Sequence, residues 1–112
     1  EYARLVRRQR EALSGPAQLR ALLPAGLDTA LFFKPRAVLS GDFFWAGAVG
    51  RQASQGTVVV VGDCSAQGAA AGKTTLRCME MLHALVEEQG QADPAHIMQA
   101  LHEMLLSLPA IG

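Results

Sequence analysis

The chain has 112 residues, half of them apolar, and its ten Lys and Arg residues balance its ten Asp and Glu residues. A chain of this length is the size of one domain and can bury roughly 65% of the surface it exposes when unfolded. The balanced charge argues against nucleic acid as a partner, and the apolar runs are far too short to cross a bilayer. Cys64 and Cys78 lack the spacing of metal ligands and fit two reduced thiols of a cytoplasmic protein.

The first part of the chain predicts helices followed by a strand. Apolar residues fall on one helical face across residues 1–13, where four arginines crowd the polar side. A second, short helix is expected over residues 16–23, and a loop then leads to a strand over 29–34 that is rich in Leu and Phe.

The middle of the chain predicts a β-hairpin. A strand over residues 43–49 is followed by a polar turn over 50–56 and by a third strand over 57–61. This third strand contains four consecutive valines, which is typical of a strand buried on both faces. We expect the two strands to pair with each other.

The remainder predicts two helices. Apolar residues at helical spacing indicate a long helix over residues 72–89, which Gly90 ends. Asp93 and Pro94 then suit the N-cap and first position of a last helix that extends to residue 108. The hairpin is followed by helices rather than alternating with them, so the predicted fold class is α+β.

Two aspartates stand at the ends of the paired strands. Asp42 precedes the first strand of the hairpin, and Asp63 follows the valine strand. A carboxylate at a strand end costs several kcal/mol to desolvate unless a cation or hydrogen-bond donors receive it. If the two carboxylates converge, they predict a metal site.

The segment from Gly68 to Thr74, sequence GAAAGKT, is similar to a phosphate-binding P-loop. A P-loop needs four residues between its two glycines so that successive N-H groups wrap the phosphates. Here three residues separate Gly68 from Gly72, and Gln67 stands where the first glycine belongs. A P-loop nucleotide-binding protein is therefore the least favoured of the interpretations.

Two motifs together resemble a known family. Residues 33–45 read FKPRAVLSGDFFW, and residues 61–68 read VGDCSAQG. They resemble the opening of sporulation-protein-E-type domains, which are metal-dependent (PPM) serine/threonine protein phosphatases of bacteria. The resemblance implies an antiparallel β-sandwich flanked by helices. It also implies that residues 1–24 are a helical lead-in and that 25–112 are the N-terminal part of a phosphatase domain, truncated here.

The same resemblance implies a role for three residues. Asp42 and Asp63 would be catalytic, metal-ligating carboxylates, and the backbone carbonyl of Cys64 would complete part of a coordination shell. Mn²⁺ or Mg²⁺ fits such oxygen ligands, and two ions about 4 Å apart can activate water for attack on phosphorus. The expected substrate is phosphoserine or phosphothreonine on a regulatory protein in the cytoplasm.

The chain also departs from the family's pattern. Ala66, Gln67, Ala70 and Lys73 replace a usual glycine, histidine, proline and large apolar residue. The family's other metal ligands come from later motifs, which would lie beyond Gly112. We therefore expect this chain alone to bind metal weakly and to hydrolyse little.

An alternative is a non-catalytic interaction module built on the same fold. It would associate through the helices at 1–23 and 94–108, with the arginine-rich lead helix suited to an acidic partner and a homodimer through the N-terminal helices as one form. His83, His96 and His102 lie on predicted helices without ligand spacing to one another, so we expect no metal site there.

Overall fold

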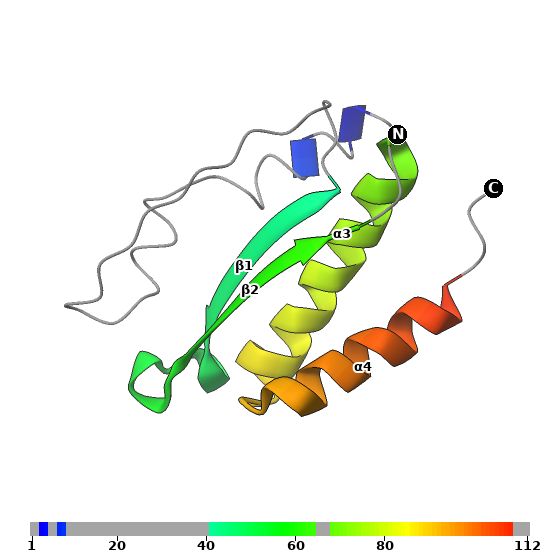
Figure 1. The fold of residues 1–112 in the computed structure, drawn as a ribbon. Coiled ribbons are helices and arrows are strands. Elements are labelled where there is room, and N and C mark those ends of the chain that lie inside the picture. The colour runs from blue at the N-terminus through cyan, green and yellow to red at the C-terminus, as the bar shows by residue number, and fades with distance from the viewer. Residues whose placement is uncertain (1–2, 5–6, 9–40, 65–67, 109–112) are drawn as a thin grey trace.

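A two-stranded antiparallel sheet lies against two helices in the computed structural model, which describes residues 3–4, 7–8, 41–64 and 68–108 (Figure 1). The elements with their bounds are the strands β1 (Asp42–Ala48) and β2 (Thr57–Asp63), the helix α3 (Gly68–Leu82), a π-helical segment η3 (His83–Glu88) and the helix α4 (Pro94–Ser107). The predicted helix at 16–23 and strand at 29–34 lie outside the described residues. The described residues thus combine two antiparallel strands with helices.

The hairpin confirms the predicted strand pairing. Asp42 of β1 is opposite Asp63 of β2, and Ala48 is opposite Thr57 at the other end. Strand β2 extends to Asp63, beyond the predicted end at residue 61, and the Cys64 N-H donates to the Gly41 carbonyl oxygen at 2.8 Å. This bond continues the ladder past both aspartates and fixes the backbone on either side of them.

Only one face of the hairpin packs on the helices. Successive side chains of a strand point to opposite faces, so Phe43 and Trp45 enter the core with the half-buried Val58 and Val60. Further members of this core come from the helices: Cys78, Met79, Leu82, Leu85, Val86, Ile97, Leu101 and Met104. The apolar positions predicted for the long helix are therefore confirmed as its buried face.

The prediction that the valine strand is buried on both faces is wrong. On the face turned away from the helices, Val59 is 50% exposed and Val61 is 84% exposed. The run of valines predicted burial because it contains no polar residue, but on this face only Phe44 of β1 is buried, and the two valines are exposed. An apolar outer face is consequently present next to the two aspartates.

The turn of the hairpin contains a residue in an unfavourable conformation. Gly50 has φ 59° and ψ 26°, and the next residue, Arg51, has φ 63°. The Gln52 N-H donates to the Val49 carbonyl oxygen at 3.0 Å and closes a turn with left-handed conformation at both central positions. Glycine adopts this conformation at no steric cost, whereas Arg51 does not.

We expect Arg51→Gly to stabilise the chain by up to about 1 kcal/mol, because relief of the left-handed strain outweighs the added freedom of the unfolded chain. Gly50→Ala is the matched control and should cost about 1 kcal/mol, since it introduces the same strain at the neighbouring position. Urea unfolding midpoints measure both changes. A loss of stability in Arg51→Gly would show that the arginine makes a contact that exceeds its strain.

The long helix begins earlier than predicted, at Gly68 rather than at residue 72, so the small residues that were expected to form a loop are helical. From His83 the helix continues with π-helical winding. The Thr75 hydroxyl donates to the Gly72 carbonyl oxygen at 3.0 Å within this helix. The segment resembling a P-loop is thus the first two turns of α3 and does not wrap as a phosphate-binding loop would.

The C-terminal end of this helix and the start of α4 follow the prediction. The Gln91 N-H donates to the Leu85 carbonyl oxygen at 2.8 Å, in the pattern of a glycine-terminated helix whose glycine is Gly90. Asp93 caps α4 by accepting a hydrogen bond from the Ala95 N-H at 3.1 Å. None of the helices in the described ranges is long and apolar enough to cross a membrane.

Candidate metal centre

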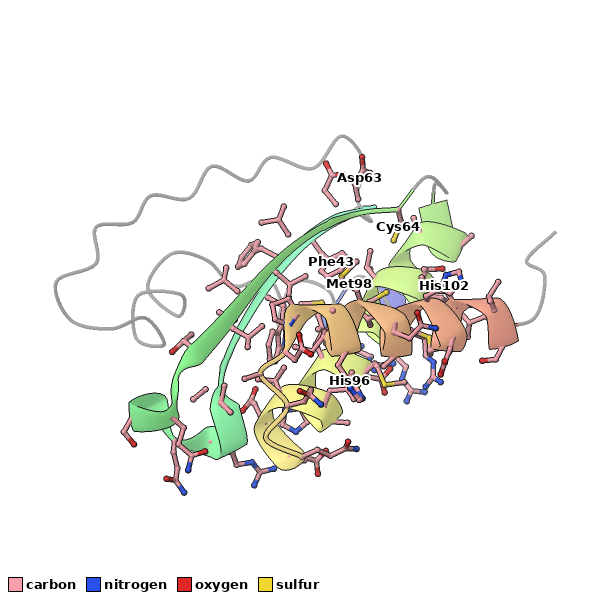
Figure 2. The ribbon with its side chains drawn as sticks, turned by 60° about the horizontal axis from the view of Figure 1, so that its bottom comes forward. Phe43, Asp63, Cys64, His96, Met98 and His102 are labelled. Atoms are coloured by element: carbon pink, nitrogen blue, oxygen red, sulfur yellow. The ribbon has the colours of Figure 1, made fainter. Side chains whose placement is uncertain are left out.

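The candidate site is the pair of carboxyl groups at the end of the hairpin remote from its turn. Directly opposite residues of an antiparallel pair project to the same face, so the register brings the side chains of Asp42 and Asp63 together. Both residues are exposed, and Figure 2 shows Asp63 at this end of the sheet. They lie on the outer face, on the same side as Val61 and Phe44.

The carboxyl group of Asp63 perturbs that of Asp42. A hydrogen bond with Asp63, and then the negative charge of Asp63, raise the pKa of Asp42 above its ordinary value of 3.8. Asp42 is exposed, and burial contributes least to this shift. Two carboxylates forced together in this way are a site that a divalent cation would neutralise.

Oxygen ligands from two carboxylates suit hard ions such as Mn²⁺ and Mg²⁺, which complete their coordination with water, carbonyl oxygens and substrate oxygens. Among the residues that the structure describes, no group of three or more His, Cys, Asp or Glu side chains is arranged to hold a metal ion. A metal ion at this place would find two carboxylates among the described residues, and backbone, water or ligand would have to fill its remaining positions.

A pH-dependent stability follows from the raised pKa of Asp42. The folded chain holds a proton on Asp42 more readily than the unfolded chain does, so this group's contribution is most favourable below its ordinary pKa and declines as the pH rises through the folded value. We expect Asp42→Asn, which keeps a hydrogen-bonding group but removes the charge, to be more stable than the wild type at pH 7. The difference should vanish near about pH 3. Urea midpoints measured across this range test the prediction, and a less stable variant at pH 7 would contradict it.

Cys64 faces the opposite way from the carboxylates. Its side chain continues the inward alternation of β2 and packs against the core beside α3 (Figure 2). Burial, and then the charges of Asp63 and Asp42, raise the pKa of the Cys64 thiol. Burial, and then Cys64, raise the pKa of Cys78 to about 11. Both thiols are free and protonated at neutral pH, which suits small core residues rather than nucleophiles. Any part of Cys64 in metal binding would be through its backbone.

The other residues singled out in the sequence lie apart from the carboxylate pair or outside the description. Ala66 and Gln67 are outside the described residues, and Lys73 is exposed on α3. His96 and His102 are exposed on α4.

Sequence reasoning missed one polar cluster, which surrounds His83. Its Nδ1 lies 3.4 Å from a carboxylate oxygen of Glu87, and its Nε2 lies 3.8 Å from one of Glu88. The spacing of His83 and Glu87 signals such a contact on any helix, but Glu88 joins because the π-helical winding of η3 turns it toward the ring. The two carboxylates approach opposite nitrogens, so they do not form one chelating site.

Comparisons with known proteins add no relative. No protein-family model, curated protein or solved structure matches this chain.

Proposed function

We propose that this chain belongs to a metal-dependent serine/threonine protein phosphatase, in which Asp42 and Asp63 hold Mn²⁺ or Mg²⁺. The single observation that supports it best is the register that places the two carboxyl groups opposite each other at one end of the hairpin. These are the two residues that the PPM resemblance assigns as ligands.

The chain's residues would act by binding and orientation. The carboxylates of Asp42 and Asp63 bind the cations and, through the ladder that continues to Cys64, remain fixed relative to each other. Bound divalent ions supply the Lewis acidity that lowers the pKa of water and neutralises phosphoryl oxygens. No protein nucleophile is required, which agrees with the protonated state of Cys64.

The outer face of the hairpin supports the proposed sandwich fold. A sheet covered by helices on one face and bearing exposed Val59 and Val61 on the other requires a second layer to bury those side chains. We propose that a second sheet packs there, as in an αββα sandwich. The carboxylate pair would then lie at the rim between the two sheets, in a phosphatase that acts on a phosphorylated regulatory protein in the cytoplasm.

Hydrolysis of a phosphoserine peptide in the presence of Mn²⁺ tests the proposal. We expect slow, EDTA-sensitive release of phosphate by the wild-type chain and none above background by Asp63→Asn. Glu88→Gln is the matched control, because it neutralises an exposed acid far from the pair, and it should leave the rate unchanged. Release that is insensitive both to EDTA and to Asp63→Asn would contradict the proposal.

A further inference from the structure

The ring of His83 has a carboxylate on each side. Its Nδ1 lies 3.4 Å from Oε1 of Glu87, and its Nε2 lies 3.8 Å from Oε1 of Glu88. The nitrogen-oxygen distance in a protein hydrogen bond is commonly about 2.7–3.2 Å, so the contact with Glu87 is long for a hydrogen bond. Nδ1 and the carboxylate oxygen therefore face each other across a gap.

The width of this gap matches two ligands of a single metal ion. Zn²⁺ lies about 2.0–2.1 Å from a histidine nitrogen and about 2.0–2.2 Å from a carboxylate oxygen, with tetrahedral angles between its ligands. Two ligand atoms at such distances and angles are about 3.3–3.5 Å apart. Nδ1 of His83 and Oε1 of Glu87 meet this requirement at 3.4 Å.

The carboxylate of Glu87 also rests against the sheet. A Cβ built on Gly47 of β1 would lie 2.9 Å from the same Oε1 atom, so the absence of a side chain at Gly47 lets the carboxylate approach the strand. The side chain of Glu87 is accordingly only 26% exposed, against 52% for Glu88. A ligand whose freedom is already restricted loses less conformational entropy when it binds an ion.

Glu88 lies where a supporting residue of a metal site is usually found. A metal-binding histidine commonly turns its second ring N-H toward a carboxylate, which orients the ring and makes it a stronger ligand. Glu88 is on the Nε2 side of His83, and the π-helical winding of η3 brings it there. This arrangement leaves Nδ1 and Glu87 for the ion.

We propose that His83 and Glu87 bind a divalent transition-metal ion such as Zn²⁺, with Glu88 as the supporting carboxylate. Imidazole suits Zn²⁺, whereas Mn²⁺ and Mg²⁺ prefer oxygen ligands such as those of Asp42 and Asp63. The site is therefore distinct from the carboxylate pair in both place and chemistry. The inference goes beyond the proposed function and does not depend on it.

The spacing between histidines does not predict this site, because its second ligand is a carboxylate. An ion here would find two side-chain ligands, His83 and Glu87, among the described residues, and backbone, water or a bound ligand would have to fill its remaining positions. We accordingly expect modest affinity, which makes the effect of single substitutions easy to measure.

Isothermal titration calorimetry of the full chain with Zn²⁺ at pH 7.5 tests the proposal, in an excess of Mg²⁺ that competes for carboxylate sites but not for imidazole. We expect saturable binding whose dissociation constant rises at least about tenfold in His83→Gln and in Glu87→Gln, and by less in Glu88→Gln. His96→Gln is the matched control, because His96 is an exposed histidine of α4 with Ala100 four residues later, and it should leave the affinity unchanged. Circular dichroism checks that every variant folds.

Nitrogen-15 NMR of the histidine rings identifies the ligand atom. We expect Zn²⁺ to shift the Nδ1 signal of His83 and to leave its Nε2 protonated, with the rings of His96 and His102 little changed. A shift that shows the ion on Nε2, or a loss of affinity in Glu88→Gln as large as that in Glu87→Gln, would contradict the proposed geometry.

Three calorimetric outcomes would overturn the proposal. The first is no saturable Zn²⁺ binding, and the second is an affinity that neither His83→Gln nor Glu87→Gln changes. The third is a loss confined to His83→Gln, which would mean that the imidazole binds without the carboxylate. None of them depends on Mn²⁺ binding or phosphate release, so a failure here is distinct from a failure of the phosphatase proposal.

Discussion

Asp63→Asn is expected to weaken Mn²⁺ binding by about tenfold or more, because even supporting residues around a metal commonly contribute that much to affinity. Asp42→Asn should do the same, since the register makes the two carboxylates equal partners of one site. Isothermal titration calorimetry at pH 7 measures both. Glu88→Gln serves again as the control, because Glu88 is an exposed acid beside a potential ligand, His83, at 3.8 Å.

The effect on stability should reverse with metal. A hydrogen bond with Asp63 and then the negative charge of Asp63 raise the pKa of Asp42. Without Mn²⁺, replacing one carboxylate by an amide removes the repulsion at neutral pH and keeps a hydrogen-bonding group, so the Asn variants should unfold at higher temperature than the wild type. With Mn²⁺ well above its dissociation constant, ligand binding stabilises the wild type by about 2.7 kcal/mol at a hundredfold excess and the variants by much less. Variants that gain as much from Mn²⁺ as the wild type would show that the metal binds elsewhere.

Gly62→Ala is expected to destabilise the chain by about 1–3 kcal/mol, because the added methyl group overlaps the ring of Phe43. Gly62 is opposite Phe43 in the ladder, and a Cβ built there would lie 2.8 Å from Cδ1 of that ring and still closer to the atoms beyond it. Phe43 is 6% exposed and held in the core, so its ring has little freedom to move away. Gly62 also precedes Asp63, so the shift of backbone should weaken Mn²⁺ binding together with stability.

A double-mutant cycle isolates this steric cause. Phe43→Leu removes the ring atoms that the new methyl group would meet, so Gly62→Ala should cost markedly less in the Phe43→Leu background. Urea unfolding of the four proteins gives the coupling free energy. Additive losses would mean that the glycine is required for some reason other than the ring of Phe43.

The sequence predicted the hairpin and the meeting of the two aspartates for a simple reason. An aromatic strand and a valine strand of similar length, joined by a polar turn, pair antiparallel. The acid at the start of the first strand and the acid at the end of the second then lie opposite each other at one end of the hairpin. The cap at Asp93 and the buried face of α3 were equally accessible, because a cap and a helical period are local signals.

Other features depended on contacts that a local pattern does not contain. The exposure of Val59 and Val61 reflects which layers lie on the sheet, and a run of valines is the same sequence whether one face is covered or both. The helical start at Gly68 was missed because glycine and alanine at a strand end also suit a loop. Neither the π-helical winding of η3 nor the left-handed Arg51 has a sequence signal of its own.

Paramagnetic broadening of amide NMR signals by substoichiometric Mn²⁺ tests the central claim most directly, because it locates the ion on the chain. We predict that the signals of residues 41–44 and 62–64 broaden first, and that Asp63→Asn abolishes the effect. Broadening centred on His83 and Glu87, or spread over the surface with these residues spared, would contradict the claim that Asp42 and Asp63 form a divalent cation site.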